Sequence, residues 1–204
     1  NAILTLQNEK GKTTKQDLRI TVYEWQNKEK IVYSKEIKGV SLNKGMNELK
    51  IPISAPEAKL WSVDDPNLYV CEVELSEGKN WVDKDSRRFG FRWFEASGIG
   101  EDAVFRLNGK RIMLRSAISW SFWPVNGIFP SEELAERQIR IAKELGLNML
   151  NFHRFIGNTD VMNYADELGL LYFEEPGGFR LDVRQPFMNA VLHEKVVRMV
   201  KRDR

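Results

Sequence analysis

The sequence predicts two folds in succession, an all-β half followed by a parallel α/β half. The first observation is a series of short apolar segments separated by polar turns, up to about residue 95. The second is a phrase that occurs twice, as Ala142-Lys-Glu-Leu-Gly-Leu-Asn-Met-Leu and as Ala165-Asp-Glu-Leu-Gly-Leu-Leu-Tyr-Phe. Each copy is typical of a helix end, a glycine stop and a short buried strand. This repetition predicts parallel α/β structure.

Composition excludes several classes of protein. The 204 residues allow one large domain or two small ones. The net charge is +2 with both signs interspersed, which gives no electrostatic footprint for nucleic acid or an anionic membrane. No apolar run reaches the length of about 18 residues that a membrane span needs. Cys71 is the single cysteine, so an intramolecular disulfide is impossible, and we expect it to be a small core residue.

The first half predicts a small β-sandwich of about six or seven strands. Its expected strands are the apolar segments at 3–6, 18–25, 31–37, 46–53, 68–75 and 81–93. The turn signals between them lie at 9–12, 43–45, 64–67 and 77–80. In the fifth segment, alternation places Cys71 on the same face as Tyr69 and puts Glu72 and Glu74 on the other face.

The second half predicts three βα units. Residues 97–102 are expected to join the domains, and Asn108-Gly109 predicts a hairpin. Helices are expected at 131–145, 159–168 and 186–201, the first with Ser131 as N-cap and an apolar stripe of Leu134, Ile141 and Leu145. The order from residue 111 suits half of a doubly wound sheet or the start of a (β/α)8 barrel. No glycine-rich phosphate loop follows a strand, which disfavours a nucleotide-binding half-fold.

Active sites of parallel α/β folds lie at the carboxyl ends of the strands, which here are followed by residues 119–126, 153–158 and 174–179. Trp120 and Trp123 either stack on sugar rings or pack against the sandwich. His153 is either a substrate donor or general base, beside Arg154, or a structural residue. His193 is expected to be solvated, and two histidines without a spaced ligand set predict no zinc site.

Glu174 and Glu175 invite comparison with the carboxylate pair of a glycosidase. Neighbouring strand residues point to opposite faces, whereas a retaining pair faces across the sugar at about 5–5.5 Å. At most one of the two is therefore expected to contact substrate. Neither a Ser-His-Asp order nor a Gly-x-Ser-x-Gly motif is present.

Three further motifs accompany the repeated Glu-Leu-Gly-Leu phrase, namely Leu60-Trp-Ser-Val-Asp-Asp-Pro-Asn-Leu-Tyr, Arg88-Phe-Gly-Phe-Arg and Leu107-Asn-Gly-Lys. Together the four motifs resemble glycoside hydrolase family 2, the β-galactosidases, β-glucuronidases, β-mannosidases and their relatives. The resemblance implies an immunoglobulin-like β-sandwich over residues 1–95. Over residues 96–204 it implies the first three βα units of a truncated (β/α)8 TIM barrel, with barrel strands at about 111–118, 147–153 and 170–175.

The resemblance also implies an activity. Family members hydrolyse β-glycosidic bonds with retention, using an acid/base glutamate after the fourth barrel strand and a nucleophile on the seventh. Both would lie beyond Arg204, so the chain is expected to be an inactive piece, without catalytic residues, of an enzyme acting on an oligo- or polysaccharide β-glycoside. A periplasmic or secreted location is favoured, and no cofactor or metal is expected. The substrate-binding candidates are Trp120, Trp123, His153, Arg154, Glu174 and Glu175.

The sequence departs from the family at two points. Ser119-Trp120 stands where the family often has a histidine, and Asn151-Phe-His-Arg154 stands where it has Arg-x-x-His. These departures favour an unusual subgroup. An interrupted barrel also leaves an open strand edge, so self-association or partial disorder of residues 110–204 is expected. The alternative is a non-catalytic sandwich that binds carbohydrate or a protein partner and carries a small α/β appendage.

Overall fold

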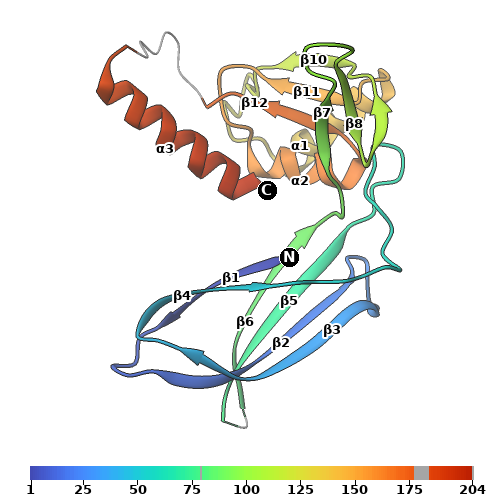
Figure 1. The fold of residues 1–204 in the computed structure, drawn as a ribbon. Coiled ribbons are helices and arrows are strands. Elements are labelled where there is room, and N and C mark those ends of the chain that lie inside the picture. Colours follow the sequence, from blue (N-terminus) through green and yellow to red (C-terminus); the bar gives the residue numbers. More distant parts are fainter. Residues whose placement is uncertain (79, 177–183, 204) are drawn as a thin grey trace. The chain divides into compact units, whose positions relative to one another are not determined.

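The computed structural model describes residues 1–78, 80–176 and 184–203, and divides the chain into two compact units (Figure 1). The sandwich unit consists of Asn1–Trp61 and Asn67–Arg92. The α/β unit consists of Ser62–Pro66 and Trp93–Arg204.

The sandwich unit contains two antiparallel sheets. The larger has the order β3-β2-β5-β6, and in the smaller β1 pairs with β4. The strands are β1 (Ala2–Asn8), β2 (Thr14–Glu24), β3 (Asn27–Leu42), β4 (Gly45–Ile51), β5 (Tyr69–Glu77) and β6 (Asn80–Phe89). Leu18, Ile20 and Val22 of β2 are fully buried, because alternation directs them all to the core face of the sheet.

Strand β5 carries a buried carboxylate on the face opposite the core. Glu72 is only 8% exposed. Its Oε2 lies 3.2 Å from Lys28 Nζ and 2.7 Å from Lys84 Nζ, and it accepts a hydrogen bond from the Tyr23 hydroxyl. Burial acts to raise the pKa of Glu72, but the hydrogen bonds from Lys84 and Lys28 hold it below its usual value. Cys71, expected in the core, is only half-buried, and burial raises the pKa of its thiol.

The α/β unit is built on a parallel sheet with the order β10-β11-β12. The strands are β10 (Ser116–Ser119), β11 (Met149–Phe152) and β12 (Leu171–Glu174). Helix α1 (Glu132–Glu144) connects the first two strands, and α2 (Thr159–Leu168) connects the last two (Figure 1). The parallel α/β structure predicted from the repeated phrase is confirmed.

The helices pack on the sheet through small and branched side chains. The core consists of Ala135, Ile139, Ala142, Leu150, Phe152, Val161, Met162, Ala165 and Leu170. The predicted stripe of α1 was wrong, since Ile141 and Leu145 are 42% and 73% exposed. The buried face of α1 includes two alanines, whose short side chains permit close packing with α2 but carry little hydrophobic signal.

An antiparallel sheet and a third helix complete the described part of this unit. The sheet contains β7 (Phe94–Ser97), β8 (Val104–Leu107) and β9 (Lys110–Ile112). The predicted Asn108-Gly109 hairpin is confirmed, with φ of 53° and 77° in the turn. The expected joint at 97–102 instead lies in the connection between β7 and β8. Helix α3 (Pro186–Asp203) has no fully buried side chain.

Asn148 ties together the starts of the parallel strands. Its buried side chain accepts a hydrogen bond from the Arg115 amide at 2.7 Å and donates to the Met113 carbonyl at 2.9 Å. Its carbonyl accepts from the Leu171 amide at 2.9 Å. One residue therefore connects the segment before β10, the start of β11 and the start of β12.

The two predicted glycine stops have similar conformations but different surroundings. Gly146 and Gly169 have φ of 76° and 79°, which favours glycine. A Cβ at Gly146 would meet nothing within 4 Å, whereas one at Gly169 would lie 2.9 Å from the Val63 carbonyl carbon. Lys143 Nζ donates to the carbonyls of Val63 and Gly169. Residues Ser62–Pro66 are therefore anchored on the helix ends.

We expect Gly169→Ala to destabilise the α/β unit by about 2 kcal/mol more than Gly146→Ala. Both substitutions place a side chain in the left-handed region, at a cost of about 1 kcal/mol each, but only the first also collides with Val63. Urea unfolding followed by the helical circular dichroism signal measures both. Equal losses would show that the Ser62–Pro66 segment moves aside without cost.

Glu72→Gln is expected to destabilise the sandwich unit by about 1–2 kcal/mol at neutral pH. Because the folded-state pKa is lowered from 4.5, this stabilisation is present above that pH and is lost as the pH falls through the folded value. Urea titrations at neutral and acidic pH measure the change. Glu74→Gln is the control with the smaller loss, because the side chain of Glu74 is 23% exposed and that of Glu72 only 10%. A pH-independent penalty would contradict the role of the charge.

Candidate functional site

A polar cluster lies at the carboxyl ends of the parallel strands. His153 Nδ1 lies 2.9 Å from Glu175 Oε1, and the Arg154 amide donates to Glu175 Oε2 at 3.1 Å. Arg154 Nε donates to His153 Nε2 at 2.8 Å. The Trp120 ring meets the His153 imidazole edge to face, with the ring centroids 5.0 Å apart. The structure therefore brings together four of the predicted site residues, which we call the strand-end cluster: Trp120, His153, Arg154 and Glu175.

The hydrogen bonds of the strand-end cluster define the tautomer of His153. The Arg154 Nε always carries a proton and can only donate, so His153 Nε2 must accept. The proton of the neutral imidazole therefore lies on Nδ1 and is donated to Glu175. This hydrogen bond, together with the one from the Arg154 amide, holds the pKa of Glu175 below its usual value. The cluster thus consists of a neutral imidazole oriented by an ionised carboxylate.

The loop between β11 and α2 reaches this geometry through a left-handed residue. Arg154 has φ of 66°, which is uncommon for a residue with a Cβ. Hydrogen bonds on both sides hold the loop, from the His153 amide to the Ser119 carbonyl and from the Glu175 amide to the Phe155 carbonyl. The loop is therefore fixed to the ends of both neighbouring strands.

Two buried serines hold the backbone around Trp120. Ser119 Oγ accepts hydrogen bonds from the Ser121 amide and from the Gln138 side chain. Trp120 itself is 58% exposed, so its indole is presented to solvent on a fixed backbone. Ser121 and Gln138 were not predicted from the sequence to be supporting residues. Gln138 is a polar residue of α1, as is typical of a helix surface, and nothing in the neighbouring sequence predicts its contact with Ser119.

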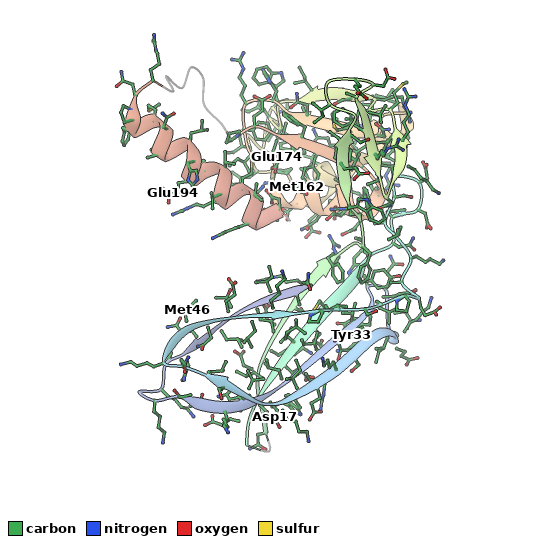
Figure 2. All side chains as sticks on the ribbon, in the orientation of Figure 1. Asp17, Tyr33, Met46, Met162, Glu174 and Glu194 are labelled. Carbon is green, nitrogen blue, oxygen red and sulfur yellow. The ribbon has the colours of Figure 1, made fainter. Side chains whose placement is uncertain are left out.

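Glu174 has different partners from Glu175, as the alternation of strand residues predicts. Its side chain is 6% exposed, and its Oε1 accepts from the Gly157 amide at 2.7 Å and lies 3.2 Å from Arg202 Nη2. Burial and the neighbouring Asp203 carboxyl raise the pKa of Glu174 to about 7. Figure 2 shows Glu174 close to the carboxyl end of α3. The structure therefore places Glu174 outside the strand-end cluster.

Trp123 also lies apart from the strand-end cluster. It is half-buried against the core between the helices and the sheet, and it exchanges two 2.8 Å backbone hydrogen bonds with Gly127. His193 is exposed on α3. Residues 177–179 of the third predicted loop lie outside the described residues.

Within 1–78, 80–176 and 184–203, no three His, Cys, Asp or Glu side chains gather as metal ligands would. None of the described helices combines the length and the apolar character needed to cross a bilayer.

Comparison with known proteins gives consistent matches. Residues 1–92 match the family model of glycosyl hydrolases family 2. A β-galactosidase of Thermoanaerobacterium thermosulfurigenes is 31% identical over 148 residues, 72% of this chain and 20% of that protein. A family 2 glycosyl hydrolase of Bacteroides cellulosilyticus superposes with a TM-score of 0.82 at 26% identity, over 98% of this chain and 27% of that one. A β-glucuronidase of Parabacteroides merdae gives a TM-score of 0.64 at 30% identity, over 78% and 19% of the two chains.

The chain is similar to members of glycosyl hydrolases family 2, whose family model matches residues 1–92. The family resemblance drawn from the sequence motifs is thereby confirmed. The chain spans only 19% to 27% of the length of these three proteins.

We expect Glu174→Gln to change how the stability of the α/β unit depends on pH. The folded-state pKa is raised from 4.5 to about 7, so the wild type loses stability as the pH rises through this interval. Glutamine stays neutral and can still accept from the Gly157 amide. In urea titrations, the variant should gain about 2 kcal/mol on the wild type between about pH 5 and pH 8.

Glu194→Gln, at an exposed ion pair of α3, is the matched control for this measurement and should follow the wild type at each pH. A wild type whose stability changes in parallel with that of Glu174→Gln would contradict the raised pKa.

Proposed function

We propose that these residues are part of a longer retaining β-glycosidase, which hydrolyses O-glycosyl bonds in carbohydrate degradation. In this proposal the α/β unit forms the first three βα units of a (β/α)8 barrel. The sandwich unit forms an immunoglobulin-like domain that ends near residue 95. Support comes from the similarity to members of the family, from the parallel order β10-β11-β12, and from the fraction of its relatives that the chain spans.

The observation that carries the proposal is the strand-end cluster, which lies where parallel α/β enzymes bind substrate. In a retaining glycosidase two carboxyl groups face each other at about 5–5.5 Å across the scissile bond. Glu174 and Glu175 bind different partners, so they do not suit that role. In this proposal the acid/base and the nucleophile lie on strands beyond Arg204, as the resemblance to the family implies.

Within the proposed enzyme, the strand-end cluster binds and orients a sugar of an oligo- or polysaccharide β-glycoside. The exposed indole of Trp120 offers an apolar plane on which a sugar ring can stack. Among the described residues, each Glu175 oxygen accepts one hydrogen bond and retains lone-pair capacity for a sugar hydroxyl. Orientation of this kind lowers the barrier by holding the substrate in a reactive geometry.

The remaining candidates take supporting roles in this proposal. Trp123 belongs to the loop after β10 and packs against the core of the α/β unit, and Glu174 holds the loop after β11. Self-association through the free edges of the parallel sheet stays a prediction, because open strand edges can pair with another chain.

The purified 204-residue chain is expected to release no aglycone from chromogenic β-glycosides, because it lacks both catalytic glutamates. A longer protein that continues past Arg204 should hydrolyse them. In that protein Glu175→Gln should lower kcat/KM by about 10- to 100-fold, since the charge that orients His153 is lost. Glu194→Gln, exposed on α3, should leave it unchanged.

Turnover by the 204-residue chain that Glu175→Gln removes would overturn this assignment. A longer protein that binds oligosaccharide in calorimetry but never hydrolyses it would instead support the non-catalytic binding module.

A further inference from the structure

The adjacent carboxylates of Glu174 and Glu175 hold the same loop at two points. The loop between β11 and α2 carries His153 and Arg154 near one end and Gly157 near the other. Glu175 accepts from the Arg154 amide and binds the His153 side chain. Glu174 accepts from the Gly157 amide at 2.7 Å. Because the two side chains leave the strand end in different directions, together they fix both ends of the loop.

The peptide of Gly157 is also held from α3. Its carbonyl accepts from Arg202 Nη2 at 2.9 Å, and the same nitrogen lies 3.2 Å from Glu174 Oε1 and 3.2 Å from Met162 Sδ. Figure 2 shows Glu174 and Met162 near the carboxyl end of α3. A Cβ at position 157 would lie 2.6 Å from the Phe152 ring, so only glycine fits between these groups. The loop therefore has a tightly enclosed contact with the end of a helix.

The end of α3 is where this helix docks on the α/β unit. None of its described side chains is fully buried, so apolar packing contributes little to its position. Its last turn supplies Arg202, which binds Gly157 and Glu174, and the Asp203 carbonyl, which accepts from the Tyr172 hydroxyl at 3.3 Å. The position of α3 thus depends on polar contacts, and the most buried of their charged partners is Glu174.

We propose that Glu174 is a positioning residue that, with Arg202, couples the docked end of α3 to the geometry of His153 and Arg154. This inference rests on the proposed function, in which the strand-end cluster orients a sugar. With Arg202 in place, the Gly157 peptide is held at both its amide and its carbonyl. The loop between β11 and α2, held by Glu175 at one end and through Gly157 at the other, then keeps Arg154 in its left-handed conformation.

Loss of Arg202 removes the donor to the Gly157 carbonyl, so the Gly157 peptide is held at its amide alone. The loop is then held less firmly at this end. With this end loosened, the backbone of Arg154 relaxes toward negative φ, where residues with a Cβ are more stable. His153 Nε2 then loses the Arg154 donor, and the imidazole is no longer confined to the tautomer with the proton on Nδ1.

Nuclear magnetic resonance of the 204-residue chain tests this coupling without any turnover. Arg202→Met removes the guanidinium and keeps most of the aliphatic stem. We expect the solvent exchange of the Arg154 amide to accelerate about tenfold or more. The side-chain ¹⁵N shifts of His153 should move from the Nδ1-protonated pattern toward a tautomer mixture. Arg198→Met, on the same helix in an exposed pair with Glu194, is the matched control and should change neither signal.

The proposal is overturned if Arg202→Met leaves the Arg154 exchange and the His153 shifts at their wild-type values. If Arg202→Met does not fold, Glu174→Ala decides the matter, because it removes the acceptor of the Gly157 amide. Shifted His153 signals in Glu174→Ala then support the coupling, and unchanged signals overturn it. An inactive longer protein would refute the glycosidase proposal and leave these signals unaffected.

Discussion

Asn148 is the constraint on which the α/β unit depends. Its side-chain amide bonds the segment before β10 and its backbone carbonyl bonds the start of β12, so the three four-residue parallel strands start at aligned positions. Because the three strands have equal length, their last residues are aligned too, and the pairing places Ser119, Phe152 and Glu174 side by side. The residue that follows each strand belongs to the strand-end cluster, namely Trp120, His153 and Glu175. A shift of one residue in any strand would separate them.

Glu174 and Glu175 are adjacent at the end of β12 and carry the same carboxyl group, but their different surroundings give them different roles. Glu175 accepts two hydrogen bonds in a half-exposed position and is stabilised as a carboxylate. Glu174 lies in the interior beside a second carboxyl group, and its pKa is raised to about 7. Burial opposes charge, and donated hydrogen bonds favour it. One glutamate therefore faces the proposed substrate with a fixed charge, while its neighbour holds the loop from the interior.

Features governed by local rules were predictable from the sequence. The Asn108-Gly109 turn, the Ser131 cap and the glycine stops depend on a few adjacent residues and are present as predicted. The strand-end grouping followed from the parallel pattern. Features made by distant partners were not predictable: lysines of two other strands bury Glu72, and α1 packs through alanines that carry no apolar stripe. Nothing near Gln138 in the sequence indicates its bond to Ser119.

The anchoring of Ser62–Pro66 by Lys143 and Gly169 has a consequence for how this protein can be divided. The chain passes between its two units at 61/62, 66/67 and 92/93, so neither unit is a continuous stretch of sequence. A single cut after Arg92 would remove from the α/β unit the five residues that close its helix ends. In protein engineering or recombination, neither unit can therefore be exchanged as one continuous stretch. Exchange of a unit requires the transfer of both of the sequence segments that form it.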